Sequence, residues 1–483
     1  MRDPTYDIIV VGGGTAGLVT AAGCVSLGAR TALVERDRLG GECLWTGCVP
    51  SKAMIGSARL AERMRRSREF GLPPAEVHPD GASVLESVRA VRARIQPHDD
   101  PARFRAMGVE VLEGDARFLT PHEIEVGGRG LRGRRFVIAT GSRPAIPPIP
   151  GLDETGYFTH ETAFDRPTIP SSVIIVGGGA IGIEFAQAYR RLGTRVCVVE
   201  MLERILPRED PEVVERLREV LAAEEIPIFT GCRGVKATRS EKAELEAVPG
   251  GSTPGAPSET IRADEIFVAT GRRPNVEELG LETAGVEAGR EGIIVDARLR
   301  TSRRHIFAAG DVIGGHLFTH VADHEARAVV RNVLFPFARP VRYDAVPWCT
   351  FTDPELAHVG LTEPEARERF GDRVRTYVYD IETLDRAITD RAATGCVKLV
   401  TDRRGRLLGG HILAPSAGTM IMEVAVAVRH GLKIGALSRL VHPYPTMGEG
   451  VRRAADMYYR GKLTERSRRW LDRYAALRRR VGR

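Results

Sequence analysis

The sequence predicts an α/β fold with two separate nucleotide-binding units, followed by a smaller α+β unit. An apolar strand, a glycine-rich turn and a small-residue helix follow one another near residue 6, and the same order recurs near residue 173. From about Pro347 onward, short apolar strands alternate with turns and helices. The chain has 483 residues, whereas single hydrophobic cores stop growing at roughly 250 to 300 residues. We therefore expect several domains.

Composition narrows the class of protein. Hydrophobic residues make up 43% of the chain and charged residues 28%, which is typical of a globular protein. No uncharged stretch is long enough to cross a bilayer, and the first ten residues, MRDPTYDIIV, lack the pattern of a secretory signal. We expect a cytoplasmic protein. The net charge of +7 is concentrated among arginines between residues 466 and 483, so we expect no nucleic-acid partner.

The first glycine-rich turn has the properties of a dinucleotide-binding site. Strand 6–11 runs into Gly12, which permits a tight turn, while Gly14 lets backbone amides approach a pyrophosphate. Gly17 lets the following helix pack closely on the strand. Glu35 ends the next strand, eighteen residues after Gly17, where a carboxylate accepts hydrogen bonds from ribose hydroxyls. The pattern predicts a Rossmann-like domain, the alternative being a tight turn in an unrelated βαβ unit.

The second turn repeats this spacing. Strand 173–176 leads into Gly177, Gly179 and Gly182, and Glu200 again lies eighteen residues after the last glycine. Two copies with the same internal spacing predict two different dinucleotides, FAD and a nicotinamide nucleotide.

Glu200 also bears on the choice of nicotinamide cofactor. A 2′-phosphate beside this carboxylate would meet like-charge repulsion, and Met201 and Leu202 supply no positive charge. NADH is therefore favoured over NADPH, although Arg204 could turn toward a phosphate.

Cys43 and Cys48 form the one close cysteine pair; the other five cysteines stand alone. An ideal helix would place the two side chains on different faces, so a disulfide needs a distorted segment. Gly47 supplies backbone freedom, and Pro50 suits the start of a helix at about that residue. A helix N-terminus and the Lys52 ammonium would favour a thiolate, which predicts a redox-active pair. The alternatives are two buried structural thiols or half of a zinc site; no CxxC spacing supports a metal site.

The segment GGECLWTGCVPSKA resembles the active-site segment of the pyridine nucleotide-disulfide oxidoreductases, the family of dihydrolipoamide dehydrogenase, glutathione reductase and mercuric reductase. The likeness continues through 139–144, from Gly177, and through 269–274 and 307–312. It implies an FAD-binding domain, an NAD-binding domain and a C-terminal dimerisation domain. The expected domains are 1–150 (FAD-binding, first part), 151–275 (NAD-binding), 276–344 (FAD-binding and central part), 345–465 (dimerisation) and 466–483 (basic C-terminal helix).

The resemblance also implies roles for single residues. Asp311 would hold the FAD ribitol, Lys52 would lie near flavin N5, and Glu184 would pair with Lys52 beside the nicotinamide; a helix-surface acid is the alternative for Glu184. Electrons would pass from NADH through FAD to Cys48 and then through Cys43 to a small-molecule substrate. Further cofactor contacts are expected from Thr140, Gly141, Gly271 and His320.

Three histidines, His316, His320 and His324, lie four residues apart and would share a helical face. A metal site is one interpretation of this spacing. A helix end beside the flavin is the favoured one, since they follow the Asp311 segment.

The C-terminal part departs from the family pattern. In dihydrolipoamide dehydrogenase and glutathione reductase, a His and a Glu from this region complete the partner's active site in a homodimer. Glu449 fits, but Tyr444 stands at the position of the catalytic His. The pKa of tyrosine is about 10, which is poorly suited to a base at neutral pH. His442 either replaces the missing base or packs in the structure.

Tyrosine at this position is similar to mercuric reductase, yet the chain has no cysteine after Cys396 to deliver Hg(II). The leading hypothesis is a mercuric-reductase-like enzyme that reduces a small disulfide, metal ion or electrophile. Dihydrolipoamide dehydrogenase is the first alternative. A non-enzymatic NADH-linked redox sensor is the second.

Two remaining segments carry weaker expectations. The tail from Thr464 places Trp470, Tyr474, Leu477 and Val481 on one helical stripe, which would dock on the dimer or lie on an anionic membrane surface; docking is favoured. The segment 242–259 is expected to be an exposed loop.

Overall fold

The structure is a computed structural model that describes residues 5–248, 259–461 and 465–481. The chain forms two compact units. Unit 1 comprises Met1–Arg204 and Ile226–Arg342, and unit 2 comprises Ile205–Glu225 and Tyr343–Arg483. The α/β fold class expected from the sequence is confirmed.

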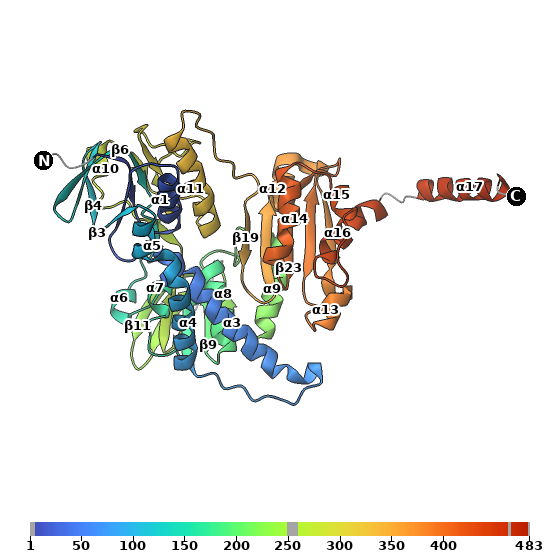
Figure 1. Cartoon of the computed structure of the whole chain (residues 1–483). Coiled ribbons are helices and arrows are strands. Elements are labelled where there is room, and N and C mark those ends of the chain that lie inside the picture. The colour runs from blue at the N-terminus through green and yellow to red at the C-terminus, as the bar shows by residue number, and fades with distance from the viewer. Residues whose placement is uncertain (1–4, 249–258, 462–464, 482–483) are drawn as a thin grey trace. The chain divides into compact units, whose positions relative to one another are not determined.

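The first sheet of unit 1 is built around the strand that precedes the first glycine turn. Strand β1 (Tyr6–Val11) pairs in parallel with β2 (Thr31–Glu35) on one side and β6 (Arg129–Ile138) on the other. Helices α1 (Thr15–Ser26) and α11 (Thr319–Leu334) lie side by side against it (Figure 1). Nearly every side chain of β1 is buried, as expected for a parallel strand covered on both faces. The remaining strands of this sheet are β3 (Glu110–Glu113), β4 (Ala116–Thr120), β5 (Glu123–Val126) and β18 (Ile306–Ala308).

The second glycine turn belongs to a smaller parallel sheet of unit 1. Its strand order is β10-β9-β8-β14, and the helix that follows the turn is α8 (Ala180–Arg191). The expected loop at 242–259 is wrong in part, because 243–248 form a strand of an adjoining antiparallel sheet; residues 249–258 lie outside the described residues. The strands of the two sheets are β8 (Ser172–Val176), β9 (Arg195–Val199), β10 (Ile228–Phe229), β14 (Glu265–Val268), β11 (Arg233–Arg239), β12 (Ala243–Val248) and β13 (Glu259–Ala263).

A two-stranded antiparallel ribbon joins the nucleotide-binding parts of unit 1. Strand β7 (Ser142–Pro144) pairs with β15 (Arg272–Pro274), with Arg272 opposite Pro144. The two similar segments that begin Ala-Thr-Gly therefore lie together, although about 130 residues separate them in the sequence. The other elements of unit 1 are α2 (Gly41–Trp45), α3 (Cys48–Arg65), α4 (Gly81–Ile95), α5 (Pro101–Ala106), α6 (Leu152–Thr155), α7 (His160–Ala163), α10 (Leu281–Ala284), β16 (Ala288–Gly289) and β17 (Gly292–Ile293).

Unit 2 is a five-stranded antiparallel sheet with strand order β19-β20-β23-β22-β21. Helix α14 (Ala417–Arg429) packs on β20 and β23, and its apolar side chains form much of the core. The strands are β19 (Pro347–Thr350), β20 (Glu355–Gly360), β21 (Arg375–Asp380), β22 (Cys396–Thr401) and β23 (Leu407–Ala414). The other helices are α9 (Pro211–Ala223), α12 (Glu363–Phe370), α13 (Asp385–Thr389), α15 (Gly435–Ser438), α16 (Glu449–Arg460) and α17 (Glu465–Val481).

One lysine lies in the core of unit 2 among three carboxylates. Lys398 is 2% exposed, and its Nζ lies 2.9 Å from Asp210, 2.8 Å from Glu212 and 2.7 Å from Glu363. These ion pairs hold α9 and α12 on β22. Among the described residues, no helix combines the length and hydropathy needed to cross a membrane.

Candidate active site

The two cysteines lie on either side of a break between two helices. Helix α2 ends at Trp45, and α3 begins at Cys48, two residues before the expected start at Pro50. At Gly47 the chain leaves helical geometry, with φ −109° and ψ −109°. Cys43 and Cys48 are present as free thiols joined by a hydrogen bond. The break in the helix at Gly47 therefore supplies the distorted segment that a Cys43–Cys48 disulfide needs.

The two thiols have opposite acid–base character. Donation from Cys43, together with contributions from Thr319 and Lys52, lowers the pKa of Cys48 to about 6 in spite of burial. The pKa of Cys43 is raised, first by the hydrogen bond that Cys43 makes to Cys48 and then by burial. The Thr319 hydroxyl lies 3.3 Å from Cys48 Sγ. These opposite shifts favour the thiolate at Cys48 and keep the proton on Cys43.

Lys52 and Glu184 form an ion pair across two helices of unit 1. Lys52 lies one turn after Cys48 on α3, and its Nζ donates to Glu184 Oε2 at 2.8 Å. Glu184 is only 6% exposed, so it is not a surface acid of α8. The Lys52 ammonium places a positive charge near Cys48, and the buried Glu184 carboxylate balances that charge. The pair also joins the redox segment to the helix that follows the second glycine turn.

The first glycine turn leaves room for a bound pyrophosphate. Gly12 has φ +104°, and a Cβ atom there would lie 2.4 Å from Ala139 O. A Cβ atom on Gly17 would lie 1.8 Å from Gly12 O, so only glycine fits there. A Cβ atom on Gly14 would have no atom nearer than 3.9 Å, so the backbone at Gly14 is open. No described side chain caps α1, so its first N–H groups are available to an anion. Glu35 Oε2 accepts from Gly13 N at 2.6 Å, which places the carboxylate at the turn.

The second glycine turn has the same construction. Gly177 has φ +115°, and a Cβ on Gly182 would lie 1.9 Å from Gly177 O. Gly179 has open space where its Cβ would be. Glu200 Oε2 accepts from Gly178 N at 2.6 Å, and its Oε1 accepts from Leu202 N at 2.7 Å. Both turns thus fit a dinucleotide: open glycine backbone, free first-turn amides and an acidic residue at the ribose position.

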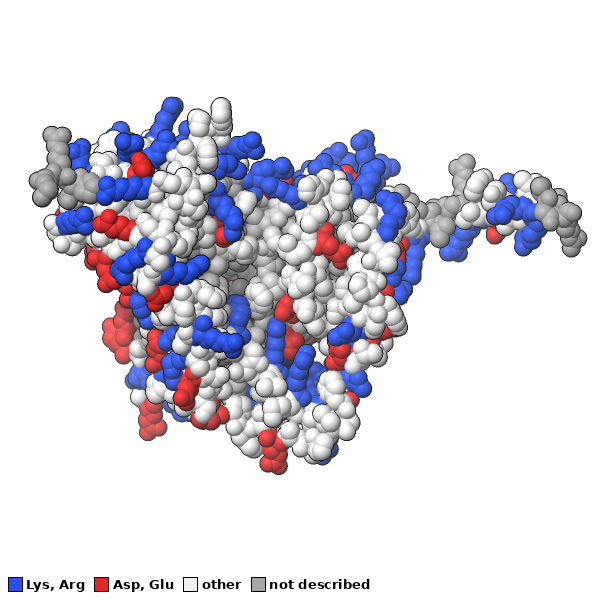
Figure 2. Space-filling view, in the orientation of Figure 1, with Lys and Arg blue, Asp and Glu red and all other residues white. Residues whose placement is uncertain are grey.

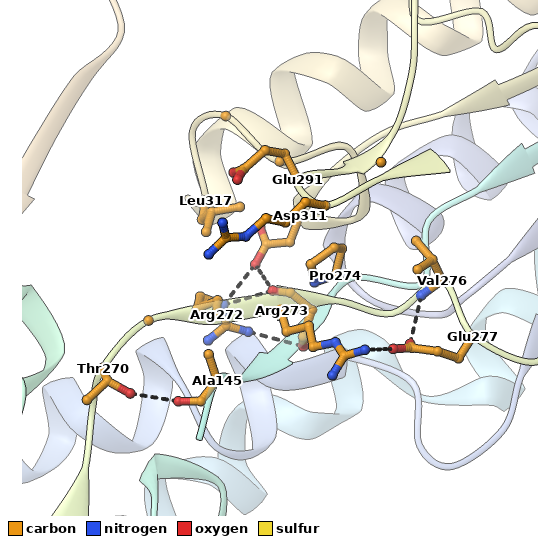
Figure 3. Close-up of a pocket in the computed structure, with 16 residues that line it drawn as sticks. Ala145, Thr270, Arg272, Arg273, Pro274, Val276, Glu277, Glu291, Asp311 and Leu317 are labelled. Carbon is orange, nitrogen blue, oxygen red and sulfur yellow. Dashed lines mark hydrogen bonds and ion pairs between the residues drawn. The ribbon is translucent and has the colours of Figure 1, made fainter. Parts of the chain in front are cut away.

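A cavity of about 610 Å³ lies in unit 1 beside the β7–β15 ribbon (Figure 3). Asp311 lines it and accepts from Ser142 Oγ at 2.6 Å, while Arg272 Nε lies 3.3 Å away. Burial raises the pKa of Asp311 even beside this arginine. Gly271, with φ +127°, also lines the cavity. A carboxylate beside a hydroxyl is a donor and acceptor set suited to the polyol chain of FAD, so these residues fit that cofactor.

The other predicted cofactor residues, Thr140, Gly141 and His320, are not among the residues that line this cavity. Gly141 has φ +69°, and Thr140 Oγ1 donates to Asn275 O at 2.7 Å, which ties the two Ala-Thr-Gly segments together. His320 lies on α11 next to Thr319 and stacks on Phe318, with ring centroids 5.3 Å apart. The expectation that His316 shares a helical face with His320 and His324 is wrong, since α11 begins only at Thr319.

Glu42 forms a buried charge network that the sequence analysis missed. Arg272 Nη1 donates to Glu42 Oε1 at 2.6 Å, and Arg272 Nη2 makes a second contact to Glu42 Oε2. His160 Nε2 lies 2.8 Å from Glu42 Oε1. Burial opposes ionisation, but the hydrogen bonds from His160 and Arg272 lower the pKa of Glu42. The only sequence signal was an acidic residue directly before Cys43; its partners lie more than 110 residues away.

The predicted C-terminal residues lie in unit 2 with local partners. Tyr444 is 70% exposed and its hydroxyl donates to Asp385 Oδ2 at 2.7 Å, a bond that raises the pKa of Tyr444. Glu449 is buried at the start of α16 and pairs with Arg452 at 2.9 Å. His442 Nε2 lies 3.2 Å from Glu423 Oε2.

Comparison with known proteins identifies the family. The family model described as pyridine nucleotide-disulphide oxidoreductase matches residues 6–326, and the model of that family's dimerisation domain matches residues 346–455. The chain belongs to the pyridine nucleotide-disulphide oxidoreductase family, whose members use FAD and NAD(P)H.

Several relatives cover almost the whole chain. It is 34% identical to mercuric reductase of Staphylococcus aureus over 94% of this chain and 82% of the relative. It is 36% identical to dihydrolipoyl dehydrogenase of Thermus scotoductus over 94% of this chain and 98% of the relative. Among solved structures, the HOCl-induced flavoprotein disulfide reductase RclA from Escherichia coli matches with a TM-score of 0.83 and 26% identity, over 93% of this chain and 99% of that chain. The chain is therefore an FAD-dependent oxidoreductase.

Proposed function

We propose that the protein passes electrons from NADH through FAD to the Cys43–Cys48 pair, and from Cys43 to a small disulfide, metal ion or electrophile. The observation that carries this proposal is the polarised dithiol: a Cys48 thiolate beside Thr319 and Lys52, with Cys43 as its hydrogen-bond donor. Bound FAD would accept a hydride from NADH and deliver an electron pair to the disulfide. The S–S bond would break on accepting the two electrons, leaving Cys48 as a thiolate and Cys43 as a thiol that takes up the proton of the hydride equivalent.

Cys43 would then reduce the acceptor. Once its proton is removed, the Cys43 thiolate attacks one sulfur of an acceptor disulfide and the other sulfur leaves as a thiolate. Cys48 attacks Cys43 in the resulting mixed disulfide, which restores the Cys43–Cys48 bond and releases the second acceptor thiolate. The Lys52 ammonium stabilises the thiolate form of Cys48 throughout. Glu184 orients that ammonium from α8, beside the proposed nicotinamide site.

Glu200 supports a preference for NADH over NADPH. Its carboxylate is 9% exposed and is held at the second glycine turn by two backbone amides. A 2′-phosphate at this position would face a fixed negative charge. The ribose hydroxyls of NADH would instead donate to it.

The dimerisation domain supports a homodimer in which the partner's C-terminal segment completes the active site. That segment would bring Tyr444 and Glu449 toward Cys43, with His442 tied to Glu423. Tyr444 donates to Asp385, and this bond raises its pKa, so it is a weak base at neutral pH. This favours an acceptor similar to that of mercuric reductase over dihydrolipoamide. The five remaining cysteines form no disulfide in the structure, as is usual in the cytoplasm, the compartment we propose.

Stopped-flow absorbance of the anaerobic holoenzyme with NADH would test the electron path. The wild type should develop a long-wavelength charge-transfer band between thiolate and flavin, and Cys48→Ser should abolish it. The same Cys-to-Ser change at the half-buried Cys197, outside the redox segment, should leave the band intact. Reoxidation by Hg(II), lipoamide or a quinone would then identify the acceptor class. Identical traces for the wild type and Cys48→Ser would refute the path. A normal band with slow reoxidation by every acceptor would favour the redox sensor.

A further inference from the structure

The helix α17 presents a narrow apolar stripe. At about 100° per residue, Trp470, Tyr474 and Leu477 fall within about 60° of arc. All three are exposed, by 64%, 49% and 60% respectively. The rings of Trp470 and Tyr474 stack with centroids 5.7 Å apart and planes 5° apart, so they form one continuous surface. A soluble helix usually turns such a stripe toward a protein core.

Arginines border the stripe on both sides. Arg473 lies about 60° to one side of Trp470 and Arg478 about 80° to the other. The helix contains seven arginines against Glu465 and Asp472, so it holds five of the seven net positive charges of the chain. Over the part of α17 that is not grey, Figure 2 shows Lys and Arg side chains interleaved with uncharged ones.

The charge distribution decides between possible partners for this helix. The rest of the chain is nearly neutral and offers no net counter-charge, and a second copy would bring another strongly positive helix. A nucleic acid would satisfy the arginines but offers no apolar phase for Trp470 and Leu477. The surface of an anionic bilayer supplies both: phosphate groups for arginine, and an interface where Trp and Tyr partition preferentially.

We propose that α17 binds parallel to the surface of an anionic lipid bilayer, with the Trp470–Tyr474–Leu477 stripe at the boundary between headgroups and acyl chains. Seven arginines in 17 residues prevent the helix from spanning the bilayer. The flanking arginines reach the headgroup phosphates, as long basic side chains do at membrane interfaces. The flavoenzyme would then act as a peripheral membrane protein. This inference is independent of the electron path through Cys48.

Flotation of the full-length holoenzyme with vesicles would test it. Vesicles of phosphatidylcholine with about 40% phosphatidylglycerol should carry the protein, and phosphatidylcholine alone should not. The double change Trp470→Ser and Leu477→Ser should weaken binding by at least about tenfold, because two large apolar side chains no longer enter the interface. The matched control, Ala475→Ser and Ala476→Ser, alters the opposite side of the same helix and should bind like the wild type.

Three outcomes would overturn the proposal. The wild type could fail to float with anionic vesicles at low salt, or bind neutral and anionic vesicles equally. The Trp470 and Leu477 variant could bind as tightly as the wild type, which would mean that charge alone acts. Duplex DNA or RNA could bind more tightly than the vesicles, with no effect of that variant, which would assign the helix to nucleic acid. Circular dichroism of each variant would verify that the fold is retained.

Discussion

The change Glu42→Gln tests whether the buried network organises the redox segment. Glu42 directly precedes Cys43 and makes a two-point ion pair with Arg272, whose side chain is 10% exposed while that of Glu42 is 28% exposed. Removing one partner of a buried pair costs about 3–5 kcal/mol. Here Arg272 retains Asp311 at 3.3 Å and Ser142 Oγ at 2.8 Å, and Gln keeps one acceptor oxygen. We therefore expect a loss of about 2 kcal/mol, or roughly 3 °C in melting temperature for a unit of this size.

The same change should alter the chemistry of Cys48. The negative charge of Glu42 raises the pKa of Cys48, in opposition to Cys43, Thr319 and Lys52. Its removal should shift the pH midpoint of Cys48 alkylation by iodoacetamide below that of the wild type. A structural defect alone would not produce this shift.

Glu244→Gln is the matched control, since Glu244 forms an ion pair with the exposed Arg262 at 2.8 Å. We expect no change in its alkylation midpoint and almost none in its melting temperature. If Glu42→Gln melted and titrated like the wild type, the network would have no positioning role.

Three further changes test other parts of the structure. Lys398→Met leaves three carboxylates without their cation and should cost about 3–5 kcal/mol at neutral pH. Burial raises the pKa values of Asp210 and Glu363, but Lys398 helps to lower them below their usual range. The stability that Lys398 supplies is therefore present above about pH 4. It is lost as the pH falls through the lowered pKa values of these two carboxyl groups. Melting curves between pH 3 and 7 should accordingly converge at the acid end, and a constant difference would contradict this. Glu200→Gln should raise kcat/KM for NADPH relative to NADH by about tenfold, because the fixed charge facing a 2′-phosphate is removed; an unchanged ratio in steady-state assays would argue that Glu200 does not select the cofactor. Tyr444→His should raise dihydrolipoamide oxidation by about 10²-fold or more by supplying a base near neutral pH, whereas Tyr444→Phe should not, and equal rates for both would exclude this position as the base.

The sequence predicted the fold well because its signals are local. Strand 6–11, the glycine turns and the acids at Glu35 and Glu200 each depend on neighbouring residues, and the structure has both turns in the expected form. The start of α3 was misplaced by two residues, because Pro50 is a permitted early helical residue but does not define the first one.

The contacts around the cysteines could not be predicted from local patterns. Thr319, Arg272 and His160 reach the redox segment from elements 118 to 271 residues away along the chain. No spacing rule links them to Cys43 or Cys48. Only the packing of the two nucleotide-binding parts of unit 1, through the β7–β15 ribbon and the α3–α8 contact, brings them together.

In the proposed electron path, the asymmetry of the two thiols would determine the role of each sulfur. A thiolate stabilised at Cys48 is a good leaving group from the Cys43–Cys48 disulfide, since a thiol of lower pKa leaves faster. The same stabilisation makes it a weaker nucleophile, so in the proposed mechanism Cys43 would attack the acceptor. Burial and the bond to Cys48 raise the pKa of Cys43, so it needs a base at the moment of attack. In the proposed homodimer, that base would come from the C-terminal segment that carries Tyr444 and Glu449. The identity of residue 444 should therefore control acceptor turnover while leaving the first step, reduction of the Cys43–Cys48 disulfide, unchanged.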